Sequence, residues 1–351
     1  MLLREHIAKE IGQHGGWISF ARYMELALHA PGLGYYASGA QKFGAGGDFV
    51  TAPELGSLFG RTLARQLKDL QPDRILELGA GSGALAETLL KELSCEYFIL
   101  ETSAALRERQ RERLGGRVQF MERLPERWRG IVLANEVADA MPVHVVGWTE
   151  QGIVERGVSL IENRFSWSER PVTGELAKEA TSIRVPAPYV SEIGLAARAW
   201  LRTLCERLDQ GLILVIDYGF PRREYYHPQR SSGTLMCHYR HQAHADPFLR
   251  PGEEDITAHL DFSTLAEAAR ETGAAVLGYA TQAQFLVNCG ITDVLAEANA
   301  ENALHYAPIA AQAQKLLSPA EMGELFKVLA VGRGIDQPLL GFSRGDRSDA
   351  L

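Results

Sequence analysis

The sequence predicts an α/β fold built on a Rossmann-like, mainly parallel sheet with helices on both faces. From residue 72 onward, short apolar runs of strand length alternate with amphipathic helical stretches. A glycine-rich turn at 78–83, LGAGSG, separates the first of these runs from the helix that follows it. The alternation breaks at 143–190 and again at 220–258, so we expect two inserted segments of strands and loops.

The composition is that of an ordinary globular protein, because 46% of its 351 residues are hydrophobic and 23% are charged. A net charge of −8 without a long basic run argues against nucleic-acid binding. No run reaches the roughly 18 apolar residues of a membrane span, and the N-terminus lacks a signal-peptide pattern. The scattered cysteines predict reduced thiols and hence a cytoplasmic protein; they are Cys95, Cys205, Cys237 and Cys289.

Residues 1–70 are predicted to form a helical cap followed by a mobile lid. Ser19 is a suitable N-cap for the helix FARYMELALH, which Pro31 ends. The next stretch, 32–51, combines many glycines with aromatic side chains, a composition that favours a loop closing over a ligand. We expect closure to bring Asp48 to the site.

The turn after the first core strand predicts a nucleoside-binding βαβ unit. Glycines at 79, 81 and 83 let the backbone lie against a ligand, with the N–H groups of a helix N-terminus behind them. The second strand ends at Glu101, 22 residues after Gly79, where a carboxylate can accept hydrogen bonds from ribose hydroxyls. Glu122 follows the third strand, in a loop expected to face the adenine. We therefore assign Gly79, Gly81, Gly83, Glu101 and Glu122 to cofactor binding.

Glu77 indicates which nucleoside is bound. A dinucleotide presents a pyrophosphate, which a carboxylate at the mouth of the loop would repel. S-adenosyl-L-methionine (SAM) carries a sulfonium and an ammonium instead, and Glu77 suits that cationic end. The pattern E-x-G-x-G-x-G therefore favours SAM over NAD.

The remaining elements complete the alternation. Strands are predicted at 118–121, 131–137, 212–219, 274–279 and 326–331, and helices at 103–113, 191–208 and 262–272. These elements divide the chain into a cap and lid (1–70), a SAM-binding half (71–142), an inserted antiparallel segment (143–190), a second half with a substrate-side insertion (191–335, with 220–258) and a tail (336–351).

A polar cluster follows the fourth strand, where ligands bind in open α/β sheets. It contains Asn135, Glu136 and Asp139, and a helix cap would need only one such residue. Asp217 ends the fifth strand on the same rim. Carboxylates at this edge favour a cationic acceptor such as a guanidinium, although surface acids of an anionic protein are the alternative.

One pattern is typical of a metal site. His238, His241 and His244 recur at a spacing of three and are followed by Asp246. Because glycine, proline and tyrosine flank the segment, we interpret it as a loop and predict no metal. There is no Ser-His-Asp or G-x-S-x-G pattern.

The chain resembles the MidA-like class I SAM-dependent methyltransferases, a family that includes a mitochondrial complex I assembly factor that methylates arginine. The resemblance rests on blocks in order from about residue 17 to 290: WISFARYMELALHAPGLGYY, GDFVTAPELGSLFG, ILELGAGSG, ANEVADAMPV, VIDYG, GTLMCHYRHQAHADPF, DITAHLDFSTL and TQAQFLVNCGI. It implies a seven-stranded class I methyltransferase sheet with an N-terminal helical cap and inserted segments.

The resemblance also implies protein arginine methylation, of a respiratory-complex-type subunit. Carried over by position, SAM would contact Gly79, Gly81 and Glu101, while the acceptor site would contain Asp48, Asn135, Glu136 and Asp139. Since arginine stays protonated at neutral pH, Glu136 and Asp139 are expected to localise a nitrogen lone pair. The expected partners are the protein substrate and, in a homodimer, a second copy of the chain.

Two alternatives stay open at this point. One is an NAD-dependent oxidoreductase, because G-x-G-x-x-A at 79–84 also satisfies the dinucleotide pattern. The other is a non-catalytic assembly factor that keeps SAM as a structural ligand.

Overall fold

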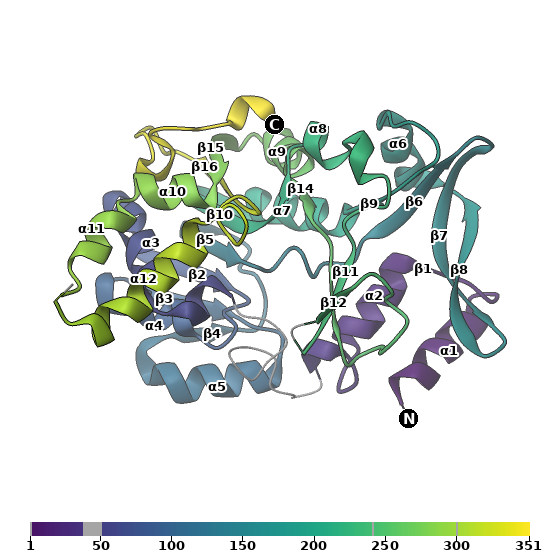
Figure 1. Ribbon diagram of the computed structural model, residues 1–351, viewed down its shortest axis with the longest axis horizontal. Coiled ribbons are helices and arrows are strands. Elements are labelled where there is room, and N and C mark those ends of the chain that lie inside the picture. The colour runs from purple at the N-terminus through teal and green to yellow at the C-terminus, as the bar shows by residue number, and fades with distance from the viewer. Residues whose placement is uncertain (1, 38–50, 241, 300) are drawn as a thin grey trace.

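The computed structural model describes residues 2–37, 51–240, 242–299 and 301–351. Its centre is a sheet in the order β15-β16-β10-β5-β2-β3-β4, with the short β14 beside β10 (Figure 1). β16 runs antiparallel to both neighbours, and the other pairs are parallel. The strands are β2 Arg74–Leu78, β3 Glu96–Leu100, β4 Gln119–Met121, β5 Trp128–Asn135, β10 Leu208–Phe220, β14 Leu260–Asp261, β15 Ala275–Thr281 and β16 Phe326–Arg333. The predicted seven-stranded path is confirmed.

Helices cover both faces of this sheet because its strands are apolar on both sides. On β10, Leu212 and Leu214 face one core cluster, and Ile213 and Val215 face the other. The first cluster takes in α3 Ser57–Leu70, α4 Ala84–Glu92, α5 Ala104–Leu114, α10 Gln282–Asn288, α11 Ile291–Ala296 and α12 Ala303–Leu317. The second takes in α7 Leu195–Arg207 and α9 Phe262–Glu271.

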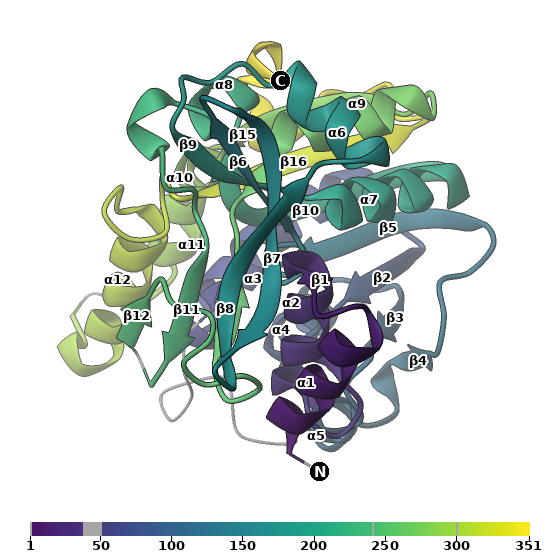
Figure 2. The ribbon, with the colours of Figure 1, turned by 90° about the vertical axis from the view of Figure 1, so that its right-hand side faces the viewer.

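The first insertion forms the predicted antiparallel strands. They build a second sheet, β1-β7-β6-β9, with β8 paired to β7. Figure 2 shows the long β7–β8 ribbon beside the two N-terminal helices, which pack on it. The elements are α1 Leu3–Gln13, β1 Ile18–Ser19, α2 Phe20–His29, β6 His144–Thr149, β7 Gly152–Ile161, β8 Arg164–Pro171, α6 Gly174–Ser182 and β9 Tyr189–Ile193.

The helices of residues 1–70, predicted to form one cap, pack on two different sheets. α1 and α2 lie on the second sheet, whereas α3 lies on the central sheet. Ser19 caps α2 as predicted, since its Oγ accepts the N–H of Arg22 at 3.1 Å. The five-part division of the chain stays a prediction. The lid prediction for 32–51, with Asp48, falls mostly outside the described residues.

Three local predictions differ from the structure. The helix predicted over 191–208 begins only at Leu195, because residues up to Ile193 form β9 and pair with β6. β5 ends at Asn135 rather than residue 137, since Glu136 turns the chain with a φ of 54°. The histidine segment, expected to be a loop, contains part of a small sheet, β12-β11-β13. The second insertion thus holds α8 Arg222–Tyr225, β11 Met236–Tyr239, β12 Gln242–His244 and β13 Asp255–Thr257.

Candidate active site

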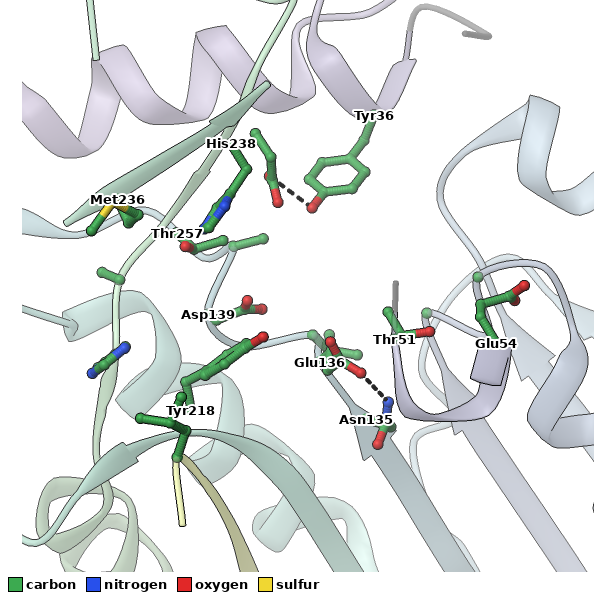
Figure 3. Close-up of a pocket in the computed structure, with 18 of the residues that line it drawn as sticks. Tyr36, Thr51, Glu54, Asn135, Glu136, Asp139, Tyr218, Met236, His238 and Thr257 are labelled. Atoms are coloured by element: carbon green, nitrogen blue, oxygen red, sulfur yellow. Dashed lines mark hydrogen bonds between the residues drawn. The ribbon is translucent and has the colours of Figure 1, made fainter. Parts of the chain in front are cut away.

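A cavity of about 690 Å³ lies at the carboxyl ends of the central strands (Figure 3). The end of β2 and the segments that follow β2 and β3 line one part of it, which we call the cofactor half. The end of β5, the end of β10 and strands β11 and β13 line the other part, which we call the acceptor half. The cavity therefore joins the central sheet to the second insertion, at the edge where α/β sheets bind ligands.

The glycine turn shapes the cofactor half. Gly79 and Gly81 line the cavity with φ angles of 61° and 54°, a left-handed conformation that favours glycine. A Cβ added to Gly81 would meet no protein atom within 4 Å, so a ligand has room to lie against this backbone. Gly83 has a different place, because it precedes α4 and packs against Leu114 instead of lining the cavity.

Two buried carboxylates complete this half. Glu101 accepts the N–H of Ser103 at 2.8 Å and the Gln110 amide at 3.2 Å, which fixes it beyond β3. Glu77 accepts the hydroxyl of Tyr97 at 2.7 Å. Burial raises the pKa of Glu101, and burial raises that of Glu77 to about 7. Both side chains line the cavity.

These residues fit SAM. Glu101 stands at the strand tip that a ribose requires, Gly81 leaves open space, and Glu77 offers a carboxylate to a cationic group. Glu122 does not join them, because it is exposed after β4 and lies outside the residues that line the cavity. Its predicted contact with the adenine has no support in this geometry.

The predicted acceptor residues come together in the second half of the cavity. The Asn135 amide donates to Glu136 Oε1 at 3.1 Å, and the Ala52 N–H donates to the same oxygen at 3.3 Å. Figure 3 shows Glu136, Asp139 and Tyr218 around the same part of the cavity. Three predicted acceptor residues, Asn135, Glu136 and Asp139, lie in the turn at 135–139 and line the cavity. The fourth, Asp48, lies outside the described residues.

Asp217 holds this turn in place from beneath. Its Oδ2 accepts three successive backbone N–H groups, those of Val137, Ala138 and Asp139, at 3.2, 2.9 and 3.2 Å. Its Oδ1 accepts the N–H of Tyr218 at 2.8 Å. Because the carboxylate is fully buried, these bonds form without competing water, and they fix where the next side chains point.

The acidic side chains of the acceptor half favour a positively charged ligand. Burial first, and then the charge of Asp217, raise the pKa of Glu136 to about 8. Burial, Asp217 and Asp255 together raise the pKa of Asp139. Among the described residues, no Lys or Arg forms an ion pair with Glu136 or Asp139. A cationic ligand would relieve the mutual repulsion and favour both ionised forms.

Sequence reasoning missed two contributors to this half. Asp255 on β13 accepts the hydroxyl of Tyr36 at 2.9 Å, and both residues line the cavity. His259 lines it as well, two residues after β13. Asp255 and His259 stand in the block DITAHLDF, whose mixture of acid and histidine in an insertion was a usable signal.

The histidines of the metal-like pattern that the structure describes do not come together in one site. His238 lines the cavity, while His244 Nε2 lies 3.0 Å from Glu254 on the far side of the small sheet, and His241 lies outside the described residues. Cys237, His244 and Glu254 have potential ligand atoms within 4.8 Å of one another. Arg250 lies 3.9 Å from the same Glu254 oxygen, which disfavours a cation there. The absence of a metal stays a prediction.

Comparisons with known proteins agree with this geometry. The model of a family described as "Putative S-adenosyl-L-methionine-dependent methyltransferase" matches residues 58–280. A Burkholderia thailandensis protein, solved bound to S-adenosyl-homocysteine, is 50% identical, has a TM-score of 0.96, and the match covers 99% of this chain and 96% of that one.

Curated relatives carry a more specific name. The zebrafish (Danio rerio) protein arginine methyltransferase NDUFAF7, mitochondrial, is 31% identical over 93% of this chain and 86% of its own length. The human protein of the same name is 27% identical over 90% and 80%. These names contradict the expected cytoplasmic location, which rested on the cysteines and the N-terminus and is withdrawn.

None of the helices in the described ranges is long and apolar enough to cross a bilayer.

The oxidoreductase alternative is set aside, because the family model, the structural neighbour and the curated relatives all concern methyl transfer. The chain belongs to the family of SAM-dependent methyltransferases whose model matches residues 58–280, and its cofactor is S-adenosyl-L-methionine.

Proposed function

We propose that this enzyme methylates a guanidino nitrogen of arginine in a protein substrate, a respiratory-complex-type subunit. The observation that carries the proposal is the set of carboxylates that line the acceptor half, formed by the buried Asp139 and Asp255 and the partly buried Glu136, with Asp217 buried beneath them. A guanidinium is planar, stays charged at neutral pH and presents several N–H donors, so it matches such a set. The names of the curated relatives support the same acceptor.

Each side chain has a distinct task in this reaction. Glu136 and Asp139 would accept N–H donors from the guanidinium and align one nitrogen. Carboxylate oxygens on the other nitrogens draw positive charge there and leave the lone pair on the reacting nitrogen. When bound, SAM supplies the electrophilic methyl group. The proton lost from the guanidinium can pass to a carboxylate oxygen of Glu136, because the bound cation favours the ionised form of this acid.

The cavity walls provide alignment and exclude water. Tyr218, Val137 and Leu106 line it with apolar surface, and Asp217 fixes the turn that carries the two acids. A methyl transfer by displacement depends on near-linear alignment of the reacting atoms, so fixed walls lower the barrier. Water at the site would screen the carboxylates and compete with the guanidinium for them.

A matched pair of peptides tests the acceptor. Radiolabelled SAM should label an arginine peptide and leave the same peptide with lysine in its place unlabelled, because a lysine ammonium cannot span two carboxylates through a planar fork. Labelling of lysine or of a hydroxyl side chain would overturn the arginine assignment. SAM binding without transfer to any protein of a respiratory-complex preparation would instead favour the non-catalytic assembly factor.

The same assay has a matched control within the chain. Glu122→Gln removes an exposed carboxylate outside the cavity and should leave the rate unchanged. Glu136→Gln removes a partly buried carboxylate that lines the cavity and should abolish most transfer. Equal rates for the two variants would contradict the proposed acceptor site.

A further inference from the structure

His259 occupies a fixed position in the wall of the acceptor half. Its ring stacks on Tyr218, with centroids 5.8 Å apart and planes 5° from parallel, and it packs against Phe220 at 5.3 Å. Its backbone N–H donates to Thr234 Oγ1 at 3.0 Å. Two ring contacts and one backbone bond therefore hold the imidazole, although it is not on a helix or a strand.

The imidazole itself has no hydrogen bond to any residue in the described part of the chain. Its Nδ1 is buried and has no hydrogen-bond partner. His259 lines the active-site cavity and also a second cavity of about 20 Å³, which is large enough for about one water molecule. Because Nδ1 is buried, Nε2 is the ring nitrogen that can face the active-site cavity. Polar side-chain atoms in a closed site are nearly always hydrogen-bonded, so a ligand in that cavity is the natural partner of Nε2.

His259 is also kept neutral. Burial is the main cause that lowers its pKa to about 4, and the positive charges of Arg230 and Lys327 add to it. Both cations lie over the ring of Phe220, at 3.8 and 5.0 Å, on which the imidazole packs. A neutral imidazole has one nitrogen that donates and one that accepts a hydrogen bond.

We propose that His259 is a substrate-binding residue that accepts an N–H of the target guanidinium from the wall of the acceptor half. This inference rests on the proposed arginine specificity. An alkylated guanidinium carries five N–H donors, and a dry cavity must satisfy each of them. A further carboxylate could do so only by adding repulsion to a set of acids that already oppose one another. A neutral acceptor satisfies a donor without adding charge.

Two variants of His259 separate this role from a purely structural one. His259→Phe keeps the aromatic stack on Tyr218 and removes both nitrogens. His259→Gln breaks the stack but keeps polar atoms near the place of the imidazole nitrogens. The proposal expects the Phe variant to raise KM for an arginine peptide by about tenfold to a hundredfold, as for a lost hydrogen bond to a charged group, and the Gln variant to recover much of it. A structural role expects the reverse order.

The measurements are peptide KM and kcat, SAM affinity by calorimetry, and thermal unfolding of each variant. SAM affinity should stay within about twofold, because His259 is not in the cofactor half. If the Phe variant does not fold, His259→Leu takes its place as the apolar variant. A Phe or Leu variant with wild-type KM, or one that outperforms Gln, overturns the inference.

The design keeps this inference separate from the proposed function. If wild-type enzyme does not methylate arginine peptides, the proposed function fails, whatever the variants do. If wild-type enzyme does so and the His259 variants keep its KM, only the role of His259 fails.

Discussion

The two halves of the active-site cavity are built in different ways. The cofactor half comes almost entirely from one stretch of chain, from Glu77 to Leu106, which holds the end of β2 and the segments that follow β2 and β3. The acceptor half draws on segments that are far apart in sequence, from Tyr36 to His259. A local unit can be recognised from its spacing, whereas a site assembled by tertiary contacts depends on which segments the fold brings together.

This difference leads to a first prediction, with the largest effect. Gly81→Val should abolish SAM binding, because valine rarely adopts a φ of 54° and its side chain would enter the open space of the cofactor half. Gly116→Ala is the control, since a Cβ there meets nothing within 4 Å and the backbone is not left-handed. Calorimetry that finds unchanged SAM affinity in Gly81→Val would show that the cofactor does not lie against this turn.

The second prediction concerns the acceptor half alone. Glu136→Gln and Asp139→Asn keep the volume of each side chain and remove its charge. Methyl transfer should fall by at least about tenfold, within the usual worth of a group that handles a proton. SAM affinity should change little, because neither residue belongs to the cofactor half.

Single-turnover rates and SAM titrations of the same preparations provide the check. Parallel losses of rate and SAM affinity would mean that the two halves are not separable, and that these acids support the cofactor site or the fold.

A third, smaller effect is expected in the cofactor half. Glu101→Ala should weaken SAM binding by about 1.5–3 kcal/mol, the range for hydrogen bonds to a charged group. Part of this loss of SAM affinity arises because the Ser103 N–H and the Gln110 amide lose Glu101 as their acceptor. Glu101→Gln keeps an acceptor oxygen, so it should lose less SAM affinity. Calorimetric titration measures both, and equal affinity in Glu101→Ala and the wild type would remove Glu101 from the site.

The last prediction concerns the pH dependence of stability. Burial raises the pKa of folded Glu136 from its ordinary 4.5 to about 8, so between these values the folded protein holds a proton that the unfolded chain releases. The stabilisation is complete below about pH 4.5 and is lost as the pH rises through 8. Relative to Glu136→Gln, the wild type should therefore become less stable from about pH 5 to pH 8.

Urea unfolding of the two ligand-free proteins at several pH values measures this difference directly. A wild type that gains stability over Glu136→Gln as the pH rises would show that the carboxylate is already paired with a positive charge.

The central sheet and the cofactor half were largely predictable from the sequence. Periodicity located the strands, and glycine spacing located the turn, because both depend on residues close together in the chain. The same local logic failed where tertiary pairing decides the structure. Residues 191–193 form a strand only because β6 lies beside them, and helical periodicity downstream concealed this.

The acceptor half shows the same limit. Glu136 and Asp139 were predicted, because they follow a core strand directly. Asp255 and His259 were not assigned to the site, since their place depends on how the second insertion folds back over the sheet. Asp217 can accept three backbone N–H groups only because the chain turns at Glu136 with a left-handed conformation. The spacing of residues in the sequence does not predict that conformation.

The way Asp217 holds the acidic turn has a consequence for changing what the enzyme accepts. The carboxylate accepts only backbone N–H groups at Val137 and Ala138, so these bonds do not depend on which side chain stands at position 137. Val137 nevertheless lines the cavity and lies against Gly79, where the two halves meet. Position 137 is thus a natural place to reshape the acceptor space, by evolution or by design, while the geometry of the two acids is retained.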